Sequence, residues 1–220
     1  MTKSLPNSVD DILLSHAAGA LDAGFALLVE THLEMSPSAR EVHAQFEALG
    51  GALLEEIAPA EVDAAALNKA LIAIDAEEAP VHREAMRSPA RPAMPEGFTL
   101  PAVLARQEIG PWRWIAPGVR SAHIALSSSS ASRAFLIEIA PGVRVPKHGH
   151  ESDELTCVLR GSFRDGNARY CEGEVARVDQ DIEHEILVDS DVPCLCLIAM
   201  EGRTRPNGWF GRLYQKLRDI

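Results

Sequence analysis

The sequence predicts an α+β, multi-domain fold in which a small N-terminal helical bundle precedes an all-β barrel. Three observations predict it. Residues 1–78 are rich in Ala, Leu and Glu, whereas residues 100–200 are rich in Val, Ile, Gly and short polar turns. Between them, a stretch with four prolines and mixed charge is typical of a linker. We therefore expect a helical domain over 1–78, a linker over 79–100, a barrel over 101–205 and a C-terminal tail over 206–220.

Apolar residues at helical spacing predict four short amphipathic helices in the first domain. The first helix carries residues 12–14, and the second spans about 22–35. Ser36 followed by Pro37 is a good N-cap and first-turn pair for the third helix. The apolar stripes of the third and fourth helices are Val42, Phe46, Leu49 and Leu53, and Leu67, Leu71 and Ile74. No single helix can bury its stripe alone, so we expect the four to form a small bundle.

Short β-rich runs predict the strands of the second domain. Residues 131–140 alternate between apolar and polar, residues 154–163 form a run that ends near Gly161, and residues 194–200 are almost continuously apolar. Residues 166–178 contain a turn at Glu172 and Gly173 between two further strands. Short strands at this spacing, joined by Gly-rich turns, predict a sandwich or barrel.

The chain carries a net charge of −11 with His neutral. Because nucleic-acid binding relies on Lys and Arg that neutralise phosphates, we expect no direct binding to nucleic acid. No apolar run is long enough to span a membrane, and the N-terminus turns acidic where a signal peptide would turn apolar, so we expect a cytoplasmic protein. The acidic surface would suit a basic protein partner, although acidity also simply keeps proteins soluble.

Three histidines and one glutamate form the main candidate site. His148 and His150 lie two residues apart in a β-rich run, so both imidazoles point to the same face. Glu154 opens the next strand, and His184 follows thirty residues later beside another β-rich run. Three imidazoles and one carboxylate can hold one divalent metal, and Zn, Mn, Fe, Ni and Cu all remain open. A His-x-His pair alone is common on surfaces, so the full spacing carries the prediction.

The spacing of these residues resembles the two motifs of the cupin family. The first motif is matched throughout by Gly142, His148, His150, Glu154 and Gly161. The second is matched in spacing by Gly173, Asp179, Asp181, His184 and Val188, but Asp179 replaces the usual Pro, Asp181 the usual Gly and Val188 the usual Asn. The resemblance implies a double-stranded β-helix barrel with one divalent metal in its mouth. The alternative is a cupin barrel that binds nothing.

The coordination number of the ion decides what such a site could do. Four side chains already fill the tetrahedral shell of Zn, our first expectation. An Mn, Fe or Ni ion with five or six ligands would keep room for water, substrate or oxygen. The site is therefore either a closed sensor or a catalytic centre.

The helical half resembles the N-terminal domain of the ChrR family of anti-sigma factors, on the segments 17–21, 31–33 and 47–55. In that family a helical anti-sigma domain precedes a cupin-like domain, and the resemblance implies a sigma factor as partner. The family's helical domain usually binds zinc through an early His and a His-x3-Cys-x2-Cys run. Here His32 is present, but Ser36 and Ala39 replace the two Cys and Asn7 the early His. We therefore expect no zinc in this half, with His32 a packed or capping residue.

Two cysteines in the last apolar run could act as a redox pair. Cys194 and Cys196 share one face of a strand, either as core residues or as a redox pair, and the ChrR resemblance points to oxidative signals.

The sequence leaves three candidate functions. The first function is an anti-sigma factor that sequesters an extracytoplasmic-function-type sigma factor and senses an oxidant or small molecule through its metal-binding barrel. The second is a cupin oxygenase or isomerase, with Glu151 and Asp153 as candidate bases. The third is a ligand-binding barrel that regulates another protein. Homodimerisation through the helices is the alternative to sigma binding.

Overall fold

The computed structural model describes residues 9–76, 91–150, 152–180, 182–201 and 204–206. Within them, helices occupy α1 (Asp10–Ala17), α2 (Ala23–Met35), α3 (Pro37–Glu55), α4 (Ala66–Ala76) and α5 (Ala102–Ala105). The strands are β1 (Arg113–Ala116), β2 (Val119–Ile124), β3 (Arg133–Ile139), β4 (Arg144–His150), β5 (Glu154–Arg160), β6 (Ser162–Asp165), β7 (Ala168–Cys171), β8 (Val175–Val178), β9 (His184–Val188), β10 (Cys194–Met200) and β11 (Thr204–Pro206). The helices thus precede the strands, as the composition predicts.

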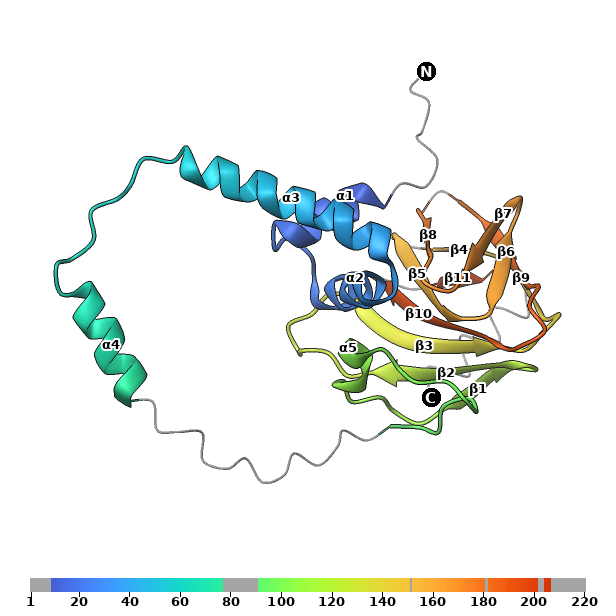
Figure 1. Ribbon diagram of the computed structural model, residues 1–220. Coiled ribbons are helices and arrows are strands. Elements are labelled where there is room, and N and C mark those ends of the chain that lie inside the picture. Colours follow the sequence, from blue (N-terminus) through green and yellow to red (C-terminus); the bar gives the residue numbers. More distant parts are fainter. Residues whose placement is uncertain (1–8, 77–90, 151, 181, 202–203, 207–220) are drawn as a thin grey trace, which may run out of the picture.

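Two antiparallel sheets form the barrel (Figure 1). One has six strands in the order β1-β2-β3-β10-β5-β8, and the other has five in the order β11-β4-β9-β6-β7. The expected turn at Glu172 and Gly173 connects β7 in one sheet to β8 in the other. Some neighbours are consecutive strands, such as β1-β2-β3 and β6-β7, but others, such as β3-β10-β5 and β4-β9-β6, are distant in sequence. The chain therefore crosses repeatedly between the sheets, and this brings β4, β5 and β9 to one barrel interior.

Strand β10 is buried on both faces, which explains its nearly continuous apolar sequence. Because side chains alternate along a strand, Leu195 and Leu197 point to one side and Cys194 and Cys196 to the other. The two leucines belong to a core shared with helix α2, and the two cysteines belong to the core between the sheets. The six-stranded sheet is therefore the middle layer, with helices outside it and the barrel interior inside it.

Helices α1, α2 and α3 pack against one another around Leu13, Val29 and Ala39. The side chain of Ser36 accepts a hydrogen bond from the Ala39 amide at 3.3 Å, so Ser36 caps α3 and Pro37 opens it, as the sequence predicts. Helix α2 has a second neighbour, because Leu27 and Leu28 pack into the core of the six-stranded sheet. This helix therefore joins the helical part to the barrel.

The prediction that all four helices pack into one bundle is wrong for α4. Helix α4 has no buried residue, and Figure 1 shows it standing away from the other helices. The apolar spacing of Leu67, Leu71 and Ile74 does form a helix, as predicted, but each of these side chains is at least 49% exposed. Periodicity shows that a helix has an apolar face, and it does not show which molecule covers that face.

Polar contacts fix α2 on the barrel at both of its ends. At the start, Asp22 accepts hydrogen bonds from the amides of Ala131 and Ser132 at 3.1 and 3.0 Å, and the Gly24 amide donates to Ser132 Oγ at 2.8 Å. At the end, His32 Nδ1 lies 2.7 Å from the Gly173 carbonyl oxygen and donates to it. His32 is only 7% exposed, which agrees with the expectation of a packed residue.

The close approach at Gly24 gives a stability prediction. A Cβ at this position would lie 2.6 Å from Ser132 Oγ, so Gly24→Ala is expected to destabilise the protein by about 1–3 kcal/mol through overpacking. Gly51→Ala is the control, because Gly51 lies inside α3 and its Cβ would meet no atom within 4 Å. There the higher helix propensity of Ala predicts stabilisation by about 0.5–1 kcal/mol. Urea unfolding of both variants should give opposite signs, and stabilisation by Gly24→Ala would contradict the packing described here.

The segments beside the barrel are described in part. Phe98 and Met94, from the expected linker, pack against the core shared by α2 and the six-stranded sheet, and Trp112 Nε1 donates to the Ala93 carbonyl oxygen at 2.8 Å. Residues 77–90, and the expected tail beyond Pro206, lie outside the described residues. No helix within the described ranges is long and apolar enough to cross a membrane.

Candidate metal centre

Two of the expected ligands face each other across neighbouring strands. His148 in β4 pairs in register with His184 in β9, and their ring centroids are 4.5 Å apart. His184 is 6% exposed, since it opens β9 with its ring on the barrel side. His150 follows two positions later in β4 and pairs through its backbone with Thr204, but its side chain lies outside what is described. The strand register thus brings His148 and His184 together across 36 residues of sequence.

Oxygen atoms fix the tautomers of both imidazoles. His148 Nδ1 lies 2.9 Å from the Pro146 carbonyl oxygen, which can only accept a hydrogen bond. His184 Nδ1 lies 2.7 Å from Asp165 Oδ2. In the neutral rings Nδ1 therefore carries the proton and Nε2 carries the lone pair, the form in which histidine ligates a metal. Burial, the largest cause, lowers the pKa of His148 and favours the neutral form.

Glu154 brings a carboxyl group into the barrel. It opens β5, where it pairs with Met200 on one side and Val178 on the other, and it is 4% exposed. Burial raises its pKa to about 7, and the nearby His184 partly opposes this rise. Its Oε1 accepts a hydrogen bond from Thr156 Oγ1 at 3.4 Å. A buried carboxylate is costly unless a cation or hydrogen bonds compensate it, so this position favours a cation nearby.

The chemistry of these donors fits a divalent metal. Two imidazoles with oriented lone pairs and one buried carboxylate form the mixed N/O set that Zn, Mn, Fe and Ni accept. Among the described side chains alone, no three His, Cys, Asp or Glu stand close enough to make a complete site. The expected fourth ligand, His150, is not among those side chains. The case for a metal therefore rests on the facing rings of His148 and His184 and on the burial of the Glu154 carboxyl group, and not on a complete ligand cluster.

Asp165 is a candidate supporting residue that sequence reasoning missed. It ends β6, next to β9 in the five-stranded sheet, and its carboxylate holds His184 Nδ1. A carboxylate that orients a ligand histidine is a common supporting element of metal sites. The local sequence, Arg-Asp-Gly-Asn, is typical of a turn, and the spacing of 19 residues to His184 matches no motif considered in the sequence analysis. Only the pairing of β6 with β9 reveals the contact.

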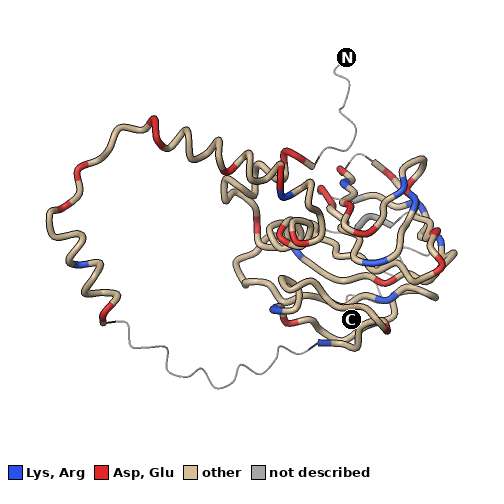
Figure 2. Tube along the Cα trace, viewed as in Figure 1, with Lys and Arg blue, Asp and Glu red and all other residues tan. Residues whose placement is uncertain are grey.

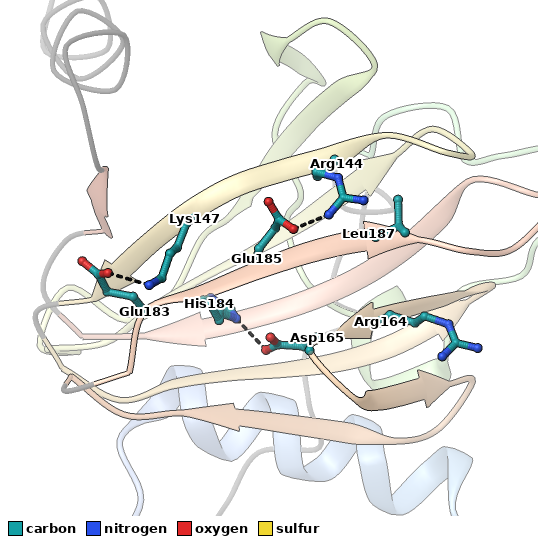
Figure 3. Close-up of a pocket in the computed structure, with 9 residues that line it drawn as sticks. Arg144, Lys147, Arg164, Asp165, Glu183, His184, Glu185 and Leu187 are labelled. Carbon is teal, nitrogen blue, oxygen red and sulfur yellow. Dashed lines mark hydrogen bonds and ion pairs between the residues drawn. The ribbon is translucent and has the colours of Figure 1, made fainter.

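A shallow surface pocket of about 300 Å³ lies beside His184 (Figure 3). Asp165 lines it together with charged residues of β4, β6 and the β9 region. Lys147 pairs with Glu183 at 3.1 Å, and Arg144 pairs with Glu185. This pocket places the Asp165–His184 contact within reach of solvent.

The two cysteines of β10 lie in the same barrel interior. Their Sγ atoms are 3.6 Å apart, Cys194 is fully buried and Cys196 is 2% exposed. The hydrogen bond with Cys194, followed by burial, raises the pKa of Cys196 well above its ordinary value. Both are free thiols in this structure. Cys196 is therefore a protonated thiol in this fold and a poor nucleophile.

Three comparisons with known proteins agree on one family. Residues 102–202 match the family described as the ChrR cupin-like domain. The anti-sigma-E factor ChrR of Cereibacter sphaeroides is 35% identical over 211 residues, which cover 94% of each chain. The crystal structure of Rhodobacter sphaeroides SigE in complex with the anti-sigma ChrR matches with a TM-score of 0.68 and 31% identity, over 89% of this chain and 98% of that one. The likeness therefore spans the helices and the barrel together.

Proposed function

We propose, from the premise that this chain belongs to the ChrR family of anti-sigma factors, that its helices sequester a sigma factor and its barrel senses a signal through a bound metal. The solved relative is a complex between a sigma factor and its anti-sigma, and the match covers nearly the whole of this chain. The single observation that carries the sigma-binding part is this full-length match. The chemistry of the exposed helical surface agrees with it.

The surface available to a sigma factor is apolar. Water-exposed side chains at the end of α3, just beyond it and along α4 have exposed fractions of 49–71%: Leu49, Leu53, Leu54, Ile57, Leu67, Leu71, Ile72 and Ile74. So many large exposed apolar side chains on two helices mark an interaction site rather than an ordinary soluble surface. An amphipathic helix that its own chain leaves uncovered suits a partner with a complementary groove.

The charge of the helical part also suits a basic partner. Residues 1–78 contain 14 acidic and 3 basic residues, a net charge of −11, whereas residues 79–220 contain 18 of each. The whole net charge of the protein therefore belongs to the helical half, and Figure 2 shows acidic positions along α1 to α4. Sigma factors bind DNA, so a basic sigma domain would be attracted electrostatically. The charge therefore favours a basic domain of a sigma factor as the partner. The family membership leads us to propose an extracytoplasmic-function-type sigma factor and action in the cytoplasm.

We infer that the barrel holds one divalent metal through His148, His150, Glu154 and His184. The paired rings of His148 and His184 and the burial of Glu154 support this ligand set. Bound there, the metal supplies a cation that compensates the buried carboxylate and ties three strands together. Zn is the ion that we expect first, with Mn, Fe or Ni as alternatives. An enzymatic role is weaker, because Asp153, one candidate base, is held in an ion pair with Arg177.

The signal in this proposal is an oxidant or small molecule that changes the metal centre. Cys194 and Cys196 are close enough to form a disulfide, with two electrons and two protons passing to a hydroperoxide that becomes an alcohol and water. Because both thiols are buried and Cys196 is held protonated, this oxidation follows an opening of the barrel. The metal centre is then the primary sensor, and the thiol pair reacts after it.

Co-expression with a sigma factor of the kind that the solved relative binds tests the whole proposal. We expect a stable one-to-one complex, inhibition of transcription from a promoter of that sigma factor, and about one metal ion per barrel by elemental analysis. A homodimer that ignores the sigma factor would contradict the first part. Catalytic turnover by a metal-replete sample that binds no sigma factor would favour the oxygenase or isomerase alternative.

The contact between Asp165 and His184 gives a prediction for metal affinity. Asp165→Asn keeps the shape of the side chain and removes the charge that orients His184, so the affinity for Zn is expected to fall about 10–100-fold. Glu185→Gln is the control, because Glu185 neighbours His184 in β9 but pairs with Arg144 on the outer face. Competition with a chromogenic chelator measures both variants, and equal affinities would mean that Asp165 does not support a ligand.

A further inference from the structure

Arg177 connects the helices to the loop that carries the expected metal ligands. It lies in β8, next to β5 in the six-stranded sheet, where it pairs in register with Leu155. Its Nη2 and Nε donate to Asp153 Oδ2 at 2.6 and 3.1 Å, and its Nη1 donates to Asp11 Oδ2 at 2.6 Å. One guanidinium therefore holds two carboxylates that are 142 residues apart in the sequence.

The two carboxylates belong to two different functional parts. Asp153 directly precedes Glu154 and follows His150 by three residues, so it is close in sequence to two expected ligands. Asp11 lies in the first turn of α1. Helix α1 in turn packs on α3, where His16 Nδ1 and His43 Nε2 are 2.9 Å apart. A continuous set of contacts thus leads from the metal-ligand segment to the helix that carries part of the apolar surface.

We propose that Arg177 is the positioning residue that couples metal occupancy of the barrel to the docking of helix α1. This inference rests on the proposed function and names its regulation. When a metal fixes Glu154, the segment before it is fixed too, and Asp153 then presents its carboxylate to Arg177. When the metal leaves, Asp153 loses this constraint and the grip on Asp11 weakens. The forked guanidinium suits the task, because it engages two acceptors from separate nitrogens, which a lysine ammonium does with less geometric control.

Arg177 adjusts an equilibrium and does not hold the fold together. The side chains of Arg177, Asp153 and Asp11 are 32%, 41% and 61% exposed, and ion pairs of this kind contribute little to stability. The main packing of the helices on the barrel comes from Leu27 and Leu28 of α2. Arg177→Gln should therefore fold, load metal and bind the sigma factor nearly as the wild type does.

Hydrogen–deuterium exchange of α1 in the full-length protein tests the coupling, with and without removal of the metal by EDTA. In the wild type we expect chelation to speed exchange in residues 10–17 by about 5-fold or more. In Arg177→Gln we expect fast exchange in both states, with no response to chelation. Asp11→Asn should behave in the same way, because it breaks the link at its other end.

Arg164→Gln is the matched control, because Arg164 pairs with Asp189, another residue of the barrel. This variant should keep the wild-type response. An Arg177→Gln protein whose α1 still responds to chelation like the wild type would overturn the inference. Elemental analysis of the same samples distinguishes a failure of the coupling from a failure of the proposed function. Metal loss without a change in wild-type α1 exchange defeats the coupling and leaves the proposed function intact. A wild type that never binds metal defeats both.

Discussion

Leu71→Asp is expected to weaken sigma-factor binding by about 100-fold or more while leaving the fold unchanged. Leu71 lies on α4 one turn after Leu67 and about one turn before Ile74, and the three side chains share one exposed face. Burying a leucine in an interface contributes about 1.5–3 kcal/mol, and an unpaired charge in its place adds a desolvation cost. Since α4 contains no buried residue, the substitution removes no internal packing.

The matched control places the same charge elsewhere on α4. Ala73→Asp also adds one carboxylate to an exposed position of the helix, but it lies away from the face of Leu67, Leu71 and Ile74. We expect its affinity to stay within a few-fold of the wild type, apart from a small electrostatic effect. Titration of the purified sigma factor against each variant, with circular dichroism to confirm folding, measures the difference. Equal affinities for the two variants would remove α4 from the interface.

Helix α4 also shows what sequence patterns can and cannot predict. The spacing of its apolar residues predicts the helix, since local periodicity determines local structure. The same spacing predicts burial in a bundle, and there it is wrong, because the surface that covers an amphipathic face can belong to another molecule. The apolar spacing of α2 likewise does not show which surface covers the helix. Leu27 and Leu28 pack on the six-stranded sheet, and no local pattern in the sequence predicts this contact.

In the candidate metal centre, too, some residues can be identified from the sequence and others only from the tertiary structure. His148, His150, Glu154 and His184 could be selected from the sequence, because ligand spacing within a motif is local and the cupin resemblance supplied the connection. Asp165 could not be selected, because its contact with His184 depends on the pairing of β6 with β9. Arg177 was missed for the same reason, since both of its carboxylate partners come from other elements. Residues that support a site are fixed by tertiary structure, and single-sequence patterns do not record that.

Glu154→Gln is expected to weaken metal binding strongly and yet stabilise the metal-free protein above pH 7. The loss of a charged ligand should lower the affinity for Zn by about 100-fold or more. The stabilisation follows from burial, which raises the pKa of Glu154 to about 7 from the ordinary value of 4.5. Between these two values the unfolded chain ionises while the folded chain keeps its proton, so the stability of the metal-free wild type falls as the pH rises. Above pH 7 the folded protein bears the full cost of ionising the buried Glu154 carboxyl group. Gln has no ionisable group, so the variant avoids this cost.

Thermal unfolding of both proteins, with EDTA and with Zn, should therefore show a reversal. With EDTA at pH 8 the variant should melt at the higher temperature, and near pH 4.5 the two should coincide. With Zn at pH 8 the wild type should melt higher, because metal that binds only the folded state stabilises it by mass action. Glu183→Gln, which neutralises an exposed partner of Lys147 beside His184, should leave both results as in the wild type. A variant that gains the same Zn-dependent stability as the wild type would show that Glu154 is a buried carboxyl group and not a ligand. The barrel would then lack the charge compensation on which its proposed response to a signal depends.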